Sequence, residues 1–297
     1  MHKPPRQFTA ALLTALAALT APVRAETPSG PYRVAMAEEP ALPGHTVYRP
    51  EPLDKTKRPL PVVAFGNGGC LNVGNAYAEF LNEVASHGYV VIAPGKIDPA
   101  WTFDRPPGAM TPMTRPGHIE AGIDWAEKEA RRKGSPWHGR IDPARVAVMG
   151  MLCGGIEAIA AGADPRARTV LVLNSGIIRP GEGVTQRPGM YNPATEADLA
   201  RLHTPMLYLN GGPADHAHRF ADGDFAQIGG LPVFYANLPV GHYGTWREAR
   251  GGEMAKVVIA WLDWQLKGDR RAQRMFAGTP CGLCTDTRWT VRRKNLN

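Results

Sequence analysis

The stretch that decides the fold is VAVMGMLCGG at residues 146–155, which runs directly into IEAIAAGA at 156–163. Its first residues form a continuous apolar run, typical of a strand covered on both faces, and the glycines predict a tight turn into a helix. Gly150 and Gly154 lie two positions before and after Leu152. Small residues at these places allow a strand-to-helix turn to present the residue between them on a sharp corner. The turn therefore presents Leu152, whose side chain has no nucleophilic atom.

The rest of the chain alternates apolar, β-rich segments with amphipathic segments. Strands are predicted at 32–37, 45–50, 60–69, 89–95, 145–150, 167–176, 204–212 and 231–239. Helices are predicted at 75–88, 118–134 and 253–268. This alternation predicts an α/β fold with a mostly parallel central sheet and helices on both faces. Ligands of such folds bind beyond the carboxyl ends of the strands.

The first 25 residues have the pattern of a secretory signal. A basic start is followed by a short apolar run and by PVRA, which puts Val23 and Ala25 at the positions that a signal peptidase reads. We therefore expect a secreted protein, periplasmic or extracellular, without a membrane anchor once residues 1–25 are removed. We expect a single domain at 26–280, a basic tail with Cys-x-x-Cys at 281–297, and a monomer.

Charge argues against a nucleic-acid partner. The chain has 34 basic and 27 acidic side chains, and three of the basic ones lie in the signal segment, which leaves a net charge of +4. This excess is small, and much of it lies in the C-terminal tail, where basic residues are usually solvated.

Two further residues complete a candidate catalytic set. Asp215 follows the strand predicted at 204–212, and His242 follows the next strand. A nucleophile position, an acid and a histidine in this order, each after a strand, are typical of an acyl-transfer triad. His216 and His218 form His-x-His, but few other ligand types lie nearby, so we expect no metal and no cofactor.

Four stretches together carry a resemblance: FGNGGC at 65–70, GMLCGG at 150–155, LNGGPADHA at 209–217 and VGHYGTW at 240–246. Over roughly residues 60–265 the chain resembles the secreted esterase and lipase branch of the α/β-hydrolase family, in the group with cutinases, polyester hydrolases and dienelactone-hydrolase-like proteins. The resemblance implies an α/β-hydrolase fold and carboxylic-ester hydrolysis through a Ser–His–Asp triad. Asp215 and His242 match this triad, whereas Leu152 stands where the serine should be.

The resemblance also implies an oxyanion hole. The FGNGGC loop would donate a backbone N–H at Gly69 or Cys70, and the residue after the nucleophile, Cys153, would donate the other. If both loops form one hole, Cys70 and Cys153 are neighbours. We therefore hypothesise a disulfide between them, with Cys281–Cys284 as a second, local bridge.

Leu152 leaves the enzymatic activity open. In one explanation the protein is a pseudoenzyme whose pocket still binds a small-molecule or polymeric ester-like ligand. In another, a recent or artificial Ser→Leu change has removed the nucleophile and left the rest of the catalytic site intact. A hydrolase using Cys153 needs a free thiol and a shifted turn, which Met151 crowds. A secreted binding or structural domain that was never catalytic gives no reason for both Asp215 and His242.

Two loops rich in proline and glycine, 95–117 and 177–194, follow strands and could wall a cleft. Their candidate apolar contacts are Trp101, Phe103, Met110 and Met113.

Overall fold

A computed structural model describes residues 27–104, 113–179 and 191–296. The strands are β1 (Arg33–Glu38), β2 (His45–Glu51), β3 (Leu60–Gly66), β4 (Val90–Pro94), β5 (Ile141–Met151), β6 (Ala167–Leu173), β7 (Met206–Asn210), β8 (Val233–Asn237) and β9 (Thr290–Lys294). The helices are α1 (Ala78–Ser86), α2 (Pro116–Arg131), α3 (Cys153–Ala161), α4 (Glu196–Ala200), α5 (His218–Gln227), α6 (Gly252–Lys267) and α7 (Arg270–Gln273).

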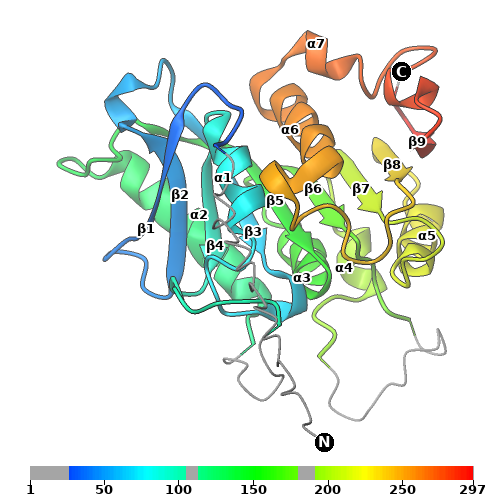
Figure 1. Cartoon of the computed structure of the whole chain (residues 1–297), viewed down its shortest axis with the longest axis horizontal. Coiled ribbons are helices and arrows are strands. Elements are labelled where there is room, and N and C mark those ends of the chain that lie inside the picture. Colours follow the sequence, from blue (N-terminus) through cyan, green and yellow to red (C-terminus); the bar gives the residue numbers. More distant parts are fainter. Residues whose placement is uncertain (1–26, 105–112, 180–190, 297) are drawn as a thin grey trace, which may run out of the picture.

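One mixed sheet crosses the molecule in the order β1-β2-β4-β3-β5-β6-β7-β8-β9, from β1 at one side to β9 at the other (Figure 1). The strands from β4 to β8 pair in parallel, and the outer pairs β1/β2, β2/β4 and β8/β9 are antiparallel. The predicted α/β class and the mostly parallel sheet are confirmed.

Helices cover both faces of the sheet. Val63 and Phe65 of β3 point into the apolar layer that holds Phe80 of α1 and Trp261 of α6. The alternate residues Val62 and Ala64 point into the opposite layer. This layer also holds apolar side chains of α2, α3 and α5, among them Ile123, Ile159 and Phe225. Because successive strand residues face opposite sides, two covered faces require the continuous apolar runs seen in the sequence.

The turn from β5 to α3 depends on a close approach of two backbone segments. Leu152 has φ 51° and ψ −126°, a region that residues with a Cβ rarely adopt. The Gly154 N–H donates to the Asn67 carbonyl at 3.1 Å. A Cβ on Gly154 would lie 2.2 Å from the carbonyl carbon of Gly66. Only glycine therefore fits where α3 meets the end of β3.

The basic segment near the C-terminus contributes the edge strand β9, which pairs with β8. Its basic side chains lie along the surface of the preceding elements: the Arg292 guanidinium lies 4.2 Å from the Tyr235 ring centroid and pairs with Asp222, and Lys294 donates to the Ile228 carbonyl at 2.7 Å. Charged residues are common on edge strands because they oppose pairing with other chains.

The expected signal segment and Met110 lie outside the described residues. Within the described ranges, every helix is too short or too polar to serve as a transmembrane span.

The contact between Gly154 and Gly66 generates a stability prediction. Gly154→Ala should lower the free energy of unfolding by about 3 kcal/mol, because the added methyl group has no room and the backbone must shift. Urea unfolding of the purified protein measures this change. The matched control is Gly117→Ala, an exposed helical position with no atom within 4 Å of the added Cβ, which should be neutral or slightly stabilising. Equal midpoints for the two variants would contradict the close-approach argument.

Candidate active site

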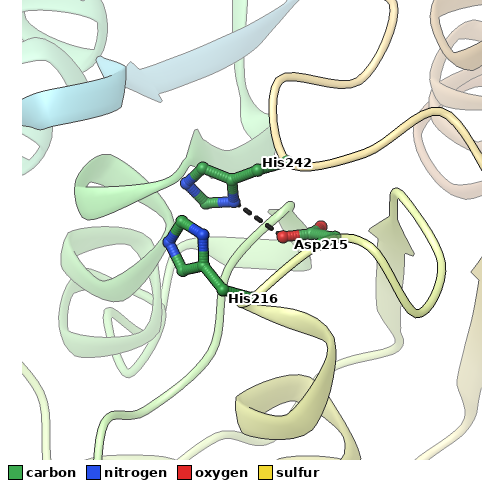
Figure 2. Close-up of side chains that lie close together, drawn as sticks. All are labelled: Asp215, His216 and His242. Atoms are coloured by element: carbon green, nitrogen blue, oxygen red, sulfur yellow. Dashed lines mark hydrogen bonds and ion pairs between the residues drawn. The ribbon is translucent and has the colours of Figure 1, made fainter. Parts of the chain in front are cut away.

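Asp215 and His242 form a hydrogen-bonded pair beyond the carboxyl ends of β7 and β8. His242 Nδ1 lies 2.6 Å from Asp215 Oδ1 (Figure 2). Asp215 is buried and His242 is half-buried. A buried carboxylate bonded to Nδ1 fixes the orientation of the imidazole and leaves its other nitrogen free for chemistry.

Four groups hold the Asp215 carboxylate. Oδ2 accepts from the Gly211 N–H at 2.9 Å and from the Asn174 amide at 2.8 Å, and Oδ1 accepts from the Ala217 N–H at 2.9 Å besides His242. Burial raises the pKa of Asp215, but these hydrogen bonds outweigh it and lower the pKa to about 2. Asp215 is therefore an anion throughout the neutral pH range.

Asn174 is a site residue that the sequence analysis missed. It follows β6 with φ 46°, and its side chain joins Asp215 to the buried indole of Trp246, whose Nε1 donates to Asn174 Oδ1 at 2.7 Å. An asparagine directly after a buried strand was the available signal, because asparagine tolerates positive φ.

His216, which we did not predict as a site residue, also lies at the site. It is exposed, and its ring centroid lies 3.5 Å from that of His242. Desolvation and the neighbouring His242 lower the pKa of His216.

Leu152, His216 and His242 line one pocket of about 150 Å³. The remaining lining residues are Cys153, Ile156, Asn174, Ser175, Gly176, Ile178, Tyr191, Ala217 and Phe220. The Leu152 side chain reaches toward the FGNGGC loop, since its Cδ1 lies 2.9 Å from the position of a Cβ on Gly68. Ser175 Oγ donates to the Leu152 carbonyl at 2.5 Å and so supports the turn.

A disulfide links the two loops beside this pocket. Cys70 is bonded to Cys153, and Cys281 is bonded to Cys284, the pairing that we hypothesised. Cys153 thus holds no free thiol in this structure. The Cys70 N–H donates to the Asn67 carbonyl at 3.1 Å, whereas the N–H groups of Gly69 and Cys153 have no acceptor among the described residues.

The apolar residues Trp101, Phe103 and Met113, which we expected to wall a cleft, lie outside the pocket that Leu152 and His242 share. Phe103 packs between Trp101 and Tyr77, at ring separations of 5.7 and 5.3 Å, and Arg247 lies 3.6 Å from its ring centroid. Met113 is exposed.

A buried carboxyl group lies behind the pocket. Glu157 of α3 accepts from Thr114 Oγ1 at 3.0 Å and from the hydroxyl of Tyr191, a lining residue, at 3.4 Å. Burial raises the pKa of Glu157 to about 7, against the opposing effect of these hydrogen bonds.

The sequence was compared with protein-family models and with curated proteins, and neither comparison found a match. The chain thus has a mixed α/β sheet with the Asp215–His216–His242 group at the carboxyl ends of its strands.

Glu157 makes stability depend on pH. Since its pKa is raised in the folded state, the folded protein binds the proton more tightly than the unfolded chain, and stability falls as pH rises from about 4.5 to about 7. Glu157→Gln removes this loss, so the variant should gain about 2–3 kcal/mol relative to the unmodified protein between pH 4.5 and pH 8.

Urea unfolding across this pH range measures the effect of Glu157→Gln. Glu120→Gln, an exposed change on α2 that removes the same charge, is the control and should follow the unmodified protein. Parallel stability curves for Glu157→Gln and the unmodified protein would show that the buried carboxyl group is not proton-linked.

Proposed function

We propose that this protein is an α/β-hydrolase-fold protein of serine-esterase ancestry that binds a carbonyl-containing ligand and does not cleave it. The observation that carries the proposal is Leu152, a residue without a nucleophilic atom in the backbone conformation of a nucleophile turn, at φ 51° and ψ −126°. It lines the same pocket as His242, whose ring is bonded to Asp215.

The strained turn supports this ancestry because leucine itself does not require it. A non-glycine residue in such a region costs on the order of 1–3 kcal/mol and persists only where the surroundings enforce it. Here Gly150, Gly154 and Gly66 make room for the turn, and the Leu152 N–H donates to the Leu173 carbonyl at 2.9 Å. Such a turn is typical of a residue that must project into a site.

Backbone donors support the carbonyl ligand. The N–H groups of Gly69 and Cys153 have no acceptor within the described chain, and the Cys70–Cys153 disulfide joins the loops that carry them. Two such donors polarise a carbonyl oxygen, which is how an oxyanion hole acts. Apolar residues of the pocket, Ile156, Ile178 and Phe220, favour an apolar group on the ligand.

Cleavage of an ester requires a nucleophile that Leu152 does not provide. Among the described residues, no hydroxyl group is hydrogen-bonded to His242, and the Ser175 hydroxyl in the same pocket donates to the Leu152 carbonyl instead. Loss of a triad serine costs on the order of 10⁶-fold in turnover. The ligand class is therefore a small-molecule or polymeric ester that is bound intact. The same proposal includes a monomeric, single-domain protein that is secreted. The two disulfides support secretion, because disulfides persist in oxidising compartments.

Leu152→Ser tests the ancestry. The variant should hydrolyse short- and medium-chain chromogenic esters on the order of 10³-fold or more above the unmodified protein, because the added hydroxyl completes a set in which Asp215 and His242 already pair. Leu152→Ala opens the pocket without a nucleophile and should stay at background. Adding His242→Ala to Leu152→Ser should return the rate to background.

Ester turnover by the unmodified protein would contradict the proposal. Turnover that appears only after reduction and disappears in Cys153→Ala would identify Cys153 as the nucleophile. If Leu152→Ser is inactive but unfolds at the same urea concentration as the unmodified protein, the fold is intact and did not descend from a serine esterase.

A further inference from the structure

We propose that His216 and His242 bind a divalent transition-metal ion of the Zn²⁺ type, with Asp215 holding His242 in place. Asp215, His216 and His242 each offer a ligand atom, and these three atoms lie within 4.8 Å of one another. Neither the Asp215–His242 pair nor the ester proposal gives the His216 imidazole a chemical role, and the ester proposal does not require a metal.

The free ring nitrogens define the site. His242 Nδ1 is bonded to Asp215, and Figure 2 shows the other nitrogen of His242 on the side away from Asp215, together with the outer nitrogen of His216. Among the described residues, neither of these two nitrogens has a hydrogen-bond partner. Two imidazole nitrogens therefore face the same space without a competing partner.

The Asp215–His242 bond matches the support that metal-binding histidines need. A histidine that ligates through one nitrogen almost always donates its other N–H to a carboxylate or carbonyl, which fixes the ring and raises its basicity. Asp215 supplies that carboxylate and is itself held by Asn174 and by the Gly211 and Ala217 N–H groups. Zn²⁺ and its neighbours in the first transition series prefer imidazole at about 2.0–2.1 Å.

His216 can complete the pair at little cost. Its backbone is held by the two residues that follow it: the Ala217 N–H donates to Asp215 Oδ1, and the His218 N–H donates to the Asp215 carbonyl at 3.0 Å. Its side chain is exposed, and the two rings are tilted by 39°. Rotation of His216 alone can bring its nitrogen to a shared ion while His242 stays bonded to Asp215.

Leu152 makes the site available to a metal. In the absence of a serine hydroxyl, the outer nitrogen of His242 is not engaged at the turn. The two histidines leave further coordination positions of a bound ion for water or for a ligand oxygen in the pocket, as in open metal sites.

Calorimetric titration of the untagged mature protein with Zn²⁺ tests the proposal. One ion should bind per chain, and His216→Ala should raise the dissociation constant at least tenfold. Asp215→Asn keeps the size of the side chain but removes the carboxylate that orients His242, so it should raise the dissociation constant for Zn²⁺ 10–100-fold. His218→Ala is the matched control, because His218 lies two residues from His216 and outside the cluster, and it should bind as the unmodified protein does.

Three outcomes would overturn the metal site. These are no binding at 0.1 mM Zn²⁺, unchanged binding in both His216→Ala and His216→Gln, or equal loss in His218→Ala. A Zn²⁺-dependent rise in melting temperature, present in the unmodified protein and absent in His216→Ala, gives a second readout that does not depend on ester hydrolysis. The result for Leu152→Ser is separate, so failure of either proposal leaves the other intact.

Discussion

The contact between the Gly66 carbonyl and the backbone of Gly154 is the constraint on which the site depends. It draws α3 against the end of β3, so the chain must turn sharply between β5 and α3, and Leu152 takes the strained conformation at that corner. The Gly154 N–H bond to Asn67 and the Cys70–Cys153 disulfide act on the same junction. A side chain at Gly154 would push these elements apart and remove the pocket with the turn.

A second anchor acts from the other half of the sheet. The Asp215 carboxylate gathers donors from the ends of β6 and β7 and from the loop after β8, through Asn174, Gly211 and His242. A buried anion with four donors is stable, whereas loss of one donor leaves a buried polar group unsatisfied. Asp215 therefore holds three loops together whether or not chemistry follows, and its presence alone does not identify an enzyme.

The sequence predicted the parts that periodicity and glycine spacing control. The parallel strands, α1, α2 and α6, the turn at Leu152 and both cysteine pairs followed from apolar runs, turn residues and the resemblance. Asn174 and His216 were missed because their roles depend on contacts across 41 and 26 residues, to Asp215 and to His242, which no local pattern encodes. The strand β9 was missed because Thr290–Lys294 is charged, and its Arg292 and Lys294 find partners only once α5 and β8 are in place.

The strain at Leu152 has an explanation that does not need catalysis at present. Cys153 lines the pocket and begins α3, and under the proposed function a site that only binds a carbonyl oxygen uses these features as an esterase would. Replacing a serine by leucine removes the nucleophile, adds apolar surface and releases the outer nitrogen of His242. Under the proposed function, the same backbone retains a ligand that a serine at position 152 would cleave, so this one side chain decides between binding and cleavage.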